Sequence, residues 1–278
     1  MPAGRSHFDL VSPTYLENWP SDLAALSLTQ AGVALSIAEA NALGRLNGVH
    51  VHRFAPADDD VRHGLRCKLD RLFNDFPDGA FVRLGSRSPK DTHLGILTGC
   101  RCKDGESTLR LLTNGSSRLA FDLGLAVHAG YAPHVFAREW LALEPWMELR
   151  CFMRERRLAG VGQYHHRDAE AGREIGFRQD SMMAAVVDFF PRFRAACHLD
   201  TAVFDVVLRP DADGGRLIAS LLELSPWTSA TDFGLFDSGN YHDMDRSFRY
   251  ANSGSRVKLP LVIQEATEPN AVCQERIG

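Results

Sequence analysis

Two apolar runs separated by a short polar stretch form the clearest pattern in the chain. Residues 202–208 and 217–222 are rich in Val, Leu and Phe. Apolar runs of this length, bounded by turn residues, are typical of buried β-strands. Residues 210–215 read Pro-Asp-Ala-Asp-Gly-Gly, in which Pro restricts φ and Gly tolerates positive φ. The pattern therefore predicts a β-hairpin.

Short apolar or alternating runs predict further strands elsewhere. Two of them are joined by the charged residues 154–157, which favours a second hairpin. After residue 239 the sequence turns polar and aperiodic, and we expect only one strand there. The predicted strands cover residues 33–35, 80–84, 107–113, 135–143, 147–154, 158–164 and 257–263.

A capping box predicts where the first long helix begins. Ser36 can accept a hydrogen bond from the backbone of Glu39, while the Glu39 side chain reaches back to the backbone of Ser36. We expect this helix to run to about residue 46 and to end at Gly48, because glycine tolerates the left-handed conformation of a C-terminal cap.

Apolar residues spaced three and four positions apart predict three more helices. The first covers residues 61–76, with Asp60 as its expected N-cap. The others cover residues 116–129 and 181–197, and we expect Pro191 to kink or break the last one.

The beginning of the chain shows little periodicity. Residues 1–20 contain three prolines, so we expect a loosely docked arm anchored by Tyr15 and Trp19. Helices mixed with antiparallel hairpins in the rest of the chain predict an α+β fold.

Length and composition narrow the class of protein without identifying a function. The 278 residues suffice for one large domain or two smaller ones, and their 45% hydrophobic and 24% charged content is ordinary for a globular protein. A net charge of −4 argues against non-specific nucleic-acid binding. We expect no signal peptide and no membrane span, since no apolar run approaches ~18 residues.

The six cysteines are scattered and form no C-x-x-C pair. Reduced thiols are the simplest explanation in a chain of this size, which predicts a cytoplasmic protein. A bacterial effector secreted without a classical signal would show the same pattern. Cys100-Arg101-Cys102 could be half of a zinc site, but no second half follows.

Two acidic residues interrupt the apolar strands of the first hairpin. Asp205 lies within one strand and Glu223 closes the other. A carboxylate among Val, Phe and Leu is costly to bury unless a cation lies against it. Two carboxylates on neighbouring strands could share a Mg²⁺ ion, with the Ser225 hydroxyl as a third oxygen ligand. A surface hairpin with solvated acids is the alternative.

Residues 81–91, FVRLGSRSPKD, place a cationic strand before a loop that contains Gly and Ser. Arg83 is flanked by apolar residues, and Arg87 and Lys90 lie in the loop. Positive charge beside exposed backbone amides is typical of a polyphosphate site. An edge strand with solvated cations would give the same pattern.

A third charged cluster reads AREWLALEPWMELRCFMR. Arg138, Glu139 and Trp140 interrupt the first predicted strand of this segment. Glu148 and Arg150 alternate onto one face of the next. A sheet face held by salt bridges is again the alternative.

Other catalytic patterns are weak. His165, His166 and His198 could be considered as metal ligands, but polar histidines after a strand are usually ordinary surface residues. The sequence contains no G-x-S-x-G, Walker or G-x-G-x-x-G motif, which disfavours a serine hydrolase, a P-loop and a Rossmann site.

Taken in order, these clusters resemble the cell division cycle protein 123 family. FVRLGSRSPKD is similar to a family segment in which Phe-x-Lys-Leu precedes Ser/Ala-Pro-Lys/Arg-Asp. REWLALEPWMELRCFMRERRLAGVGQ resembles its Arg-Lys-Trp, Pro, Glu-Phe-Arg-Cys-Phe-Val and Leu-Ile-Gly-x-x-Gln elements. FDVVL and LLELSPWTSATDFGLF are similar to its Phe-Asp-Ile-Tyr and Asp-Phe-Asn-Pro-x-x-x-x-Thr-Asp-x-Leu-Leu-Phe. The resemblance is co-linear over residues 75–237, more than half of the chain.

The resemblance implies an ATP-grasp fold, in which two α+β lobes clasp a nucleotide cleft. It places an N-terminal lobe, with the phosphate-binding strand and loop, at residues 1–136. A C-terminal lobe, with the hinge and the metal-binding hairpin, would cover residues 137–250, and residues 251–278 would form a tail. The implied ligands are ATP and Mg²⁺.

Carried over by position, the resemblance assigns residues to the ATP. Arg83 stands where the family has its phosphate-binding Lys, and residues 138–140 fall on the hinge that meets adenine through backbone groups. The implied nucleotide-binding residues are Arg83, Lys90, Arg138, Glu139, Trp140, Arg150, Asp205 and Glu223.

The same correspondence implies a metal site and two catalytic cations. Asp205 and Glu223 take the Mg²⁺-binding positions, and Ser225 is the implied third ligand. Arg83 and Arg150 would stabilise charge on the transferring phosphoryl group.

The chain departs from the family pattern at several of these positions. Arg83 replaces Lys and keeps the charge, and Glu223 replaces Asp with a longer arm. Ser225 replaces Asn, which weakens one Mg²⁺ contact. Further changes lie at the open end of the implied cleft, so the acceptor or partner could differ even where ATP is retained.

Two functions follow from the resemblance. One is an ATP-grasp ligase or phosphotransferase, in which an acceptor carboxylate attacks the γ-phosphate and an amine takes the acyl group. The other is an assembly chaperone without turnover, as eukaryotic family members assemble translation initiation factor two with support from ATP. We expect a protein or small-molecule acceptor, and neither a nucleic-acid nor a membrane partner.

Overall fold

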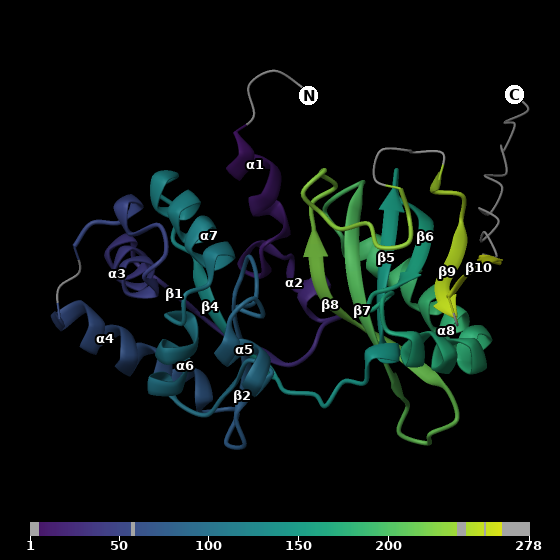
Figure 1. Cartoon of the computed structure of the whole chain (residues 1–278), viewed down its shortest axis with the longest axis horizontal. Helices are drawn as coiled ribbons and strands as arrows, with labels where there is room; N and C mark the ends of the chain where they lie inside the picture. Colours follow the sequence, from purple (N-terminus) through teal and green to yellow (C-terminus); the bar gives the residue numbers. More distant parts are fainter. Residues whose placement is uncertain (1–5, 57–58, 238–242, 253, 263–278) are drawn as a thin grey trace, which may run out of the picture.

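The computed structural model describes residues 6–56, 59–237, 243–252 and 254–262. They form two β-sheets side by side, each with its own helices (Figure 1). This arrangement confirms the predicted α+β class. Within the described ranges, every helix is too short or too polar to cross a membrane.

The first sheet has four strands in the order β1–β4–β2–β3, and all neighbours are antiparallel. Buried leucines of the surrounding helices pack with β2 and β4 to form its core. The strands are β1 (Gln30–Ala34), β2 (Ala80–Leu84), β3 (Arg101–Cys102) and β4 (His134–Glu139), and the helices are α3 (Ile37–Asn47), α4 (Asp59–Asp70), α5 (His93–Thr98), α6 (Gly105–Leu112) and α7 (Ser117–His128).

The second sheet has six strands in the order β10–β9–β6–β5–β7–β8. The β6–β9 pair is parallel and the other pairs are antiparallel. The long helix α8 (Ala169–Ala196) supplies buried Met, Val and Phe side chains to the core of this sheet. The strands are β5 (Glu148–Arg154), β6 (Arg157–Gln163), β7 (Ala202–Pro210), β8 (Leu217–Ser225), β9 (Ser247–Asn252) and β10 (Ser255–Pro260).

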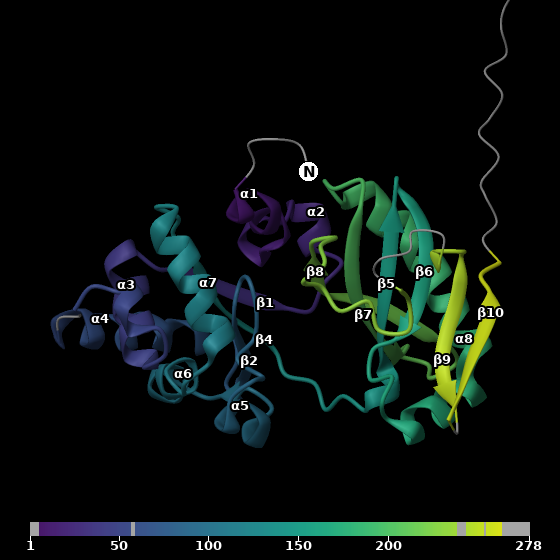
Figure 2. The same cartoon turned by 45° about the horizontal axis from the view of Figure 1, so that its top comes forward.

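The N-terminal segment joins the two halves of the molecule. It contains α1 (His7–Val11), η1 (Ser12–Thr14), η2 (Leu16–Asn18) and α2 (Ser21–Ala24). Its residues Leu16, Trp19 and Leu23 belong to the core of the second sheet, while the backbone N–H of Leu16 donates to Gly85 O, beyond β2, at 3.2 Å. The chain then crosses to the first sheet and returns through residues 140–144, the extended segment between the sheets in Figure 2, which leads into the short 3₁₀ helix η5 (Pro145–Met147).

The prediction of a loosely docked arm is therefore wrong for the described part of the segment. Tyr15 and Trp19 are 5% and 7% exposed, so both are core residues rather than surface anchors. Residues 1–5 lie outside the described residues. The sequence pattern does not reveal this packing, because short 3₁₀ turns leave no regular hydrophobic period.

The central hairpin is confirmed as β7 and β8. Asp205 is paired with Glu223, but the next residue, Val206, is paired with Leu221. Leu222 is therefore an extra residue in β8, and this bulge changes the direction of the strand beside Glu223.

The predicted start and end of the first long helix are confirmed in α3. Ser36 and Glu39 form the capping box, and Gly48 follows the helix with a φ of 80°. The N-cap prediction for Asp60 is wrong, because α4 begins at Asp59 and places Asp60 in its first turn.

The strand predicted at residues 107–113 is wrong, since most of it belongs to α6. Asp104 caps this helix by accepting a hydrogen bond from the Ser107 backbone at 2.7 Å. The leucines that suggest a strand instead lie on the buried face of a helix.

The break that the sequence allowed at Pro191, as the alternative to a kink, does not occur. α8 runs unbroken over 28 residues and begins well before residue 181, with Asp168 as its N-cap. Proline removes one backbone hydrogen bond. Phenylalanines on both sides of Pro191 are buried, and their packing outweighs that loss.

The C-terminal part of the second sheet adds a strand that the sequence pattern does not predict. β9 is this additional strand, and β10 is the strand expected at residues 257–263, of which residue 263 lies outside the described residues. β9 and β10 extend into the segment predicted as a tail. The predicted lobe boundary at residue 136 falls within β4.

Candidate functional site

A row of four charged side chains lies where the two sheets meet. Arg150 of β5 is the register partner of Asp205 on β7, which in turn is the partner of Glu223 on β8. Arg83 of β2, in the other sheet, donates from Nη2 to Glu223 Oε1 at 2.9 Å. The charges alternate along the row, so each carboxylate has the cation that its burial requires.

The Arg150–Asp205 pair is bidentate. Arg150 Nε and Nη2 donate to Asp205 Oδ1 and Oδ2, both at 2.8 Å, and the Asp205 side chain is 2% exposed. Arg150 also donates to the backbone oxygen of Asp232 and lies 4.7 Å from the ring centre of Tyr164. The guanidinium thus connects two strands with the loop after β8.

The two carboxyl groups differ in how easily they ionise. Burial raises the pKa of Asp205 to about 6, although Arg150 opposes this effect. Burial also raises the pKa of Glu223, but Arg83, Lys90 and Arg150 together outweigh it and hold the pKa below its ordinary value. Glu223 is therefore firmly ionised at neutral pH, whereas the ionisation of Asp205 is favoured by Arg150 alone.

Arg138 stabilises the bulge in β8. It is 3% exposed, and its Nη1 donates to Leu222 O at 2.8 Å while Nη2 donates to Ser27 Oγ at 2.6 Å. Burial and the neighbouring Arg83 lower the pKa of Arg138 to about 9, against the effect of Glu223. Its side chain therefore connects β4 of the first sheet with β8 of the second sheet.

The predicted interruption of the strand at residues 138–140 is corrected by the structure, because β4 continues through Glu139. Glu139 forms a 3.1 Å ion pair with Arg209 of β7. Trp140 packs instead under Arg101, whose guanidinium lies 4.4 Å from its ring centre.

A small cavity, here called the cleft cavity, lies on one side of Glu223 between the two sheets. Its volume is about 70 Å³. The predicted nucleotide-binding residues that line it are Arg83, Lys90, Arg138, Glu139 and Glu223, and its apolar lining is Leu28, Phe81, Leu141, Leu143 and Leu222.

The cleft cavity fits a nucleotide in the types of its residues but not in its size. Leucines and Phe81 suit the face of a base, and Arg83 and Lys90 suit phosphates. A volume of about 70 Å³ is well below the ~300–1,000 Å³ of typical ligand sites. A nucleotide would enter only if Lys90, which is exposed, and the segment with Leu141 and Leu143 moved outward.

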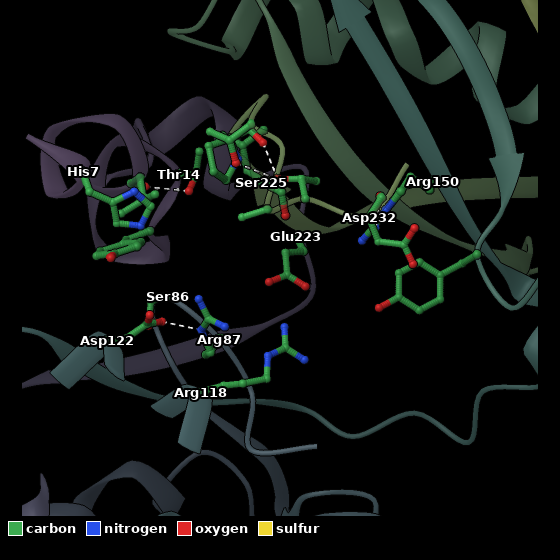
Figure 3. Close-up of a pocket in the computed structure, with 18 residues that line it drawn as sticks. His7, Thr14, Ser86, Arg87, Arg118, Asp122, Arg150, Glu223, Ser225 and Asp232 are labelled. Carbon is green, nitrogen blue, oxygen red and sulfur yellow. Dashed lines mark hydrogen bonds and ion pairs between the residues drawn. The ribbon is translucent and has the colours of Figure 1, made fainter. Parts of the chain in front are cut away.

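A larger cavity, here called the outer cavity, is also lined by Glu223 (Figure 3). Its volume is about 300 Å³. The N-terminal segment, the loop after β2, α7 and the loop after β8 all contribute to its wall. Arg150, Glu223 and Ser225 line it, so most of the predicted site residues divide between the two cavities. Trp140 and the buried Asp205 line neither.

The predicted metal ligands lie close in the sheet but are already paired. Glu223 and Ser225 are two residues apart on β8, and Asp205 faces Glu223 across the hairpin. Arg150 and Arg83 hold the two carboxylates. In the described part of the chain, no group of three or more His, Cys, Asp or Glu residues is placed to hold a metal ion.

Of the other candidate metal ligands, His165 and His198 lie in different parts of the structure, and the two cysteines are protonated. His165 lies 3.3 Å from Glu148, whereas His198 contacts Pro13 O at 2.9 Å on the N-terminal segment. Burial raises the pKa of both Cys100 and Cys102 to about 11, which disfavours the thiolates that zinc requires.

Several residues of the outer cavity were not among the predicted site residues. Arg118 and Asp122 come from α7, Tyr15 from the N-terminal segment and Asp232 from the loop after β8. Asp122 could have been identified from the sequence, because it stands between Leu119 and Leu123 near the apolar face of its helix, where a charged residue needs a partner. The others have no local pattern and are brought to the cavity by tertiary contacts.

The sequence of this chain matches a known protein family. The D123 family model matches residues 60–276. Cell division cycle protein 123 of Phaeosphaeria nodorum is 36% identical over 104 residues, which are 37% of this chain and 26% of that protein. The match thus spans about a quarter of the relative's length.

Two solved structures of Cdc123 from Schizosaccharomyces pombe, one of them C-terminally truncated, share the fold. Both superpose with a TM-score of 0.65 at 20% identity, and the alignments cover 84% of this chain and 91% and 90% of theirs. Identity at this level supports the fold alone. Because the family model covers well over half of the sequence, the chain belongs to the D123 family.

Proposed function

We propose that this protein binds ATP and Mg²⁺ between its two sheets, in the manner of an ATP-grasp protein, and transfers the γ-phosphoryl group to an acceptor carboxylate. The observation that carries the proposal is the row Arg150–Asp205–Glu223–Arg83, which separates two cavities. One cavity has the residue types for a nucleotide, and the other leaves room for an acceptor.

The cleft cavity would hold the base and the first phosphates. Phe81 and Leu222 lie on opposite sheets and would enclose the base, while Arg83 and Lys90 would bind phosphate oxygens. Glu139 ends β4 and Leu141 lies on the segment that follows it, which is where a hinge between the two sheets would be. The cavity must widen first, so binding would separate the sheets and closure would exclude water.

Asp205 and Glu223 supply the oxygen ligands that Mg²⁺ prefers, with Ser225 beside them. When bound, Mg²⁺ would neutralise charge on the triphosphate. Arg150 and Arg83 would then exchange their carboxylate partners for phosphate oxygens. The ion pairs thus keep the acids neutralised until the ligands arrive, and the released arginines would stabilise the phosphoryl group in transfer.

In the proposed reaction an acceptor carboxylate oxygen bonds to the γ-phosphorus as the bond to the β,γ-bridging oxygen breaks. ADP leaves with the electron pair of that bond, and an acyl phosphate forms. An amine would then attack the acyl carbon, and phosphate would leave while the amine proton passes to a base. The scattered cysteines of the sequence support a reducing compartment, so we place this activity in the cytoplasm.

The second candidate is an ATP-dependent protein-assembly chaperone without turnover. The observation that favours it is that both predicted carboxylate ligands of the metal already have arginine partners, so nucleotide could act mainly as a clamp between the sheets. ADP release that requires an added fraction of small molecules would favour the ligase. Tight binding without ADP release under any fraction would favour the chaperone.

Replacing Lys90 with alanine tests the nucleotide site. Lys90 is exposed, makes no ion pair within the described residues and has only a distant contact with the Phe81 ring, 5.8 Å from its centre, so the fold should be little affected. We expect ATP affinity to fall about tenfold, because a hydrogen bond to a charged group contributes ~1.5–3 kcal/mol. Isothermal titration calorimetry of the full chain would measure it.

The matched control is Lys103→Ala, which removes an exposed lysine after β3 that lines neither cavity. Its ATP affinity should equal that of the wild type. The nucleotide assignment is wrong if the wild type binds no ATP, or if Lys90→Ala and Lys103→Ala bind it equally well.

A further inference from the structure

The outer cavity contains polar groups that the proposed nucleotide site does not use. Its volume of about 300 Å³ reaches the ~300–1,000 Å³ range of small-molecule sites without any movement of the chain. Glu223 forms part of its wall and also part of the cleft cavity. A molecule in the outer cavity would therefore lie next to the predicted position of phosphoryl transfer.

Tyr15 is one of the residues that line this cavity, and it carries an unpaired donor. The side chain is 5% exposed, and its buried hydroxyl has no hydrogen-bond partner among the described residues. Buried hydroxyls are usually paired, so such a group is costly to leave unmatched. Burial and the nearby Asp122 raise the pKa of Tyr15 above its ordinary value, so the hydroxyl keeps its proton and can donate it to an acceptor oxygen.

Arg118 provides an unpaired cation in the same cavity. Three arginines line it, but Arg87 is paired with Asp122 and Arg150 with Asp205. The guanidinium of Arg118 forms no ion pair within the part of the chain that the structure describes. Figure 3 shows Arg87 and Arg118 extending from the side of the first sheet toward Glu223. A free guanidinium fork suits the two oxygens of a carboxylate.

We propose that the outer cavity is the acceptor site and binds a small, polar carboxylic acid whose carboxylate faces Arg118 beside Glu223. A further oxygen of the acid would accept from Tyr15. The hydroxyls of Ser225 and Thr228 lie in the same wall and add polar contacts. This assignment rests on the proposed function, because it gives the acceptor of that reaction a chemical class.

The N-terminal segment gives this site a wall that the family match does not include. His7, Thr14 and Tyr15 line the cavity, whereas the D123 model matches residues 60–276. Selectivity for the acid thus depends in part on a segment outside the matched region. The same segment is fixed by core contacts of Leu16 and Trp19, so Tyr15 is held rigidly in place.

The test is a titration of the full chain, without nucleotide, by isothermal titration calorimetry. The probes are succinate, L-malate, citrate and L-glutamate, with uncharged succinamide as the matched control for succinate. We expect at least one acid to bind and succinamide not to bind. ATP affinity of each variant is measured in parallel.

Arg118→Ala should weaken the acid at least tenfold, because it removes a charge-assisted hydrogen bond. Arg118→Lys should restore part of the affinity, and Tyr15→Phe, which removes only the hydroxyl, should weaken the acid about fivefold. Arg192→Ala removes an exposed arginine of α8 outside both cavities and should change nothing. ATP affinity should stay at the wild-type value in all four variants.

Three results of the acid titrations would overturn the assignment, and one result of the parallel ATP titrations would do so as well. The three are the absence of binding by every acid, equal binding of succinamide and succinate, and acid binding that survives both Arg118→Ala and Tyr15→Phe. If Arg118→Ala lowers ATP affinity as much as Lys90→Ala does, the cavity holds the triphosphate and the acceptor assignment is wrong. If acids bind but ATP does not, the proposed function fails separately and the acid site has no acceptor role.

Discussion

Replacing Asp205 with alanine is expected to lower the free energy of unfolding by roughly 3–5 kcal/mol. The change leaves the guanidinium of Arg150, whose side chain is 12% exposed, without its bidentate partner. An unpaired buried charge is far more costly than the pair itself is stabilising. Urea denaturation, followed by circular dichroism, would measure the difference.

The matched control lies on the same hairpin. Asp213 is exposed in the turn between β7 and β8, and Asp213→Ala should change stability by less than ~0.5 kcal/mol. The double variant Asp205→Ala/Arg150→Ala should be less destabilised than the sum of the single variants, because the buried charge disappears with its partner. Equal stability of Asp205→Ala and the wild type would show that the pair is not buried as described.

Asp205→Asn separates the ion pair from the proposed metal ligand. Asparagine keeps the shape of the side chain but not its charge, so the protein should stay folded at reduced stability. If Asp205 holds Mg²⁺, the gain in ATP affinity that Mg²⁺ produces in the wild type should be largely lost in this variant. An unchanged Mg²⁺ dependence would mean that Asp205 serves only Arg150, and Asp213→Asn is the control for the charge change.

Replacing Gly172 with alanine is expected to destabilise the protein by about 3 kcal/mol or more. Gly172 lies in α8 where the helix crosses β9, and an added Cβ would lie 1.6 Å from the backbone oxygen of Ala251. A backbone atom cannot rotate away, so the helix and the strand would have to separate. Thermal or urea unfolding would report the loss.

Gly176, one helical turn further along α8, is the matched control. A Cβ there would meet its nearest atoms, on Asn252 and Tyr250, at 3.5 Å, which is ordinary contact. Gly176→Ala should therefore be neutral or stabilising by up to ~1 kcal/mol, since alanine favours the helix over glycine. Similar effects of the two substitutions would contradict the close approach of α8 to β9.

Much of the local structure was readable from the sequence. The capping box of Ser36 and Glu39 and the turn chemistry at residues 210–215 depend on neighbouring residues, so they act wherever the chain is placed. The failed predictions concern elements whose local signals compete. α6 has the leucine content of a strand but the Asp104 cap of a helix, and α8 contains Pro191 but has enough buried phenylalanine to continue through it.

The candidate site, too, could be predicted from the sequence only in part. That Asp205 and Glu223 need cations follows from their apolar neighbours, and the sequence supplies cations at Arg83 and Arg150. Which cation meets which acid does not follow, because Arg83 and Glu223 are 140 positions apart and meet only when the two sheets come together. The outer cavity is harder still to predict from the sequence, since its wall comes from six separate stretches of the chain.

The sequence by itself determined the hairpin, the helices α3, α4 and α7 and part of α8, most of the strands, and the residue types of a charged site. It did so because backbone preferences, capping and hydrophobic periods act over a few residues. Only the tertiary structure decided that Tyr15 is buried at the outer cavity, that the Arg118 side chain lies near Glu223 with no ion pair among the described residues, and that β9 joins β6 in the second sheet. These features depend on contacts between segments far apart in the chain, which no local pattern records.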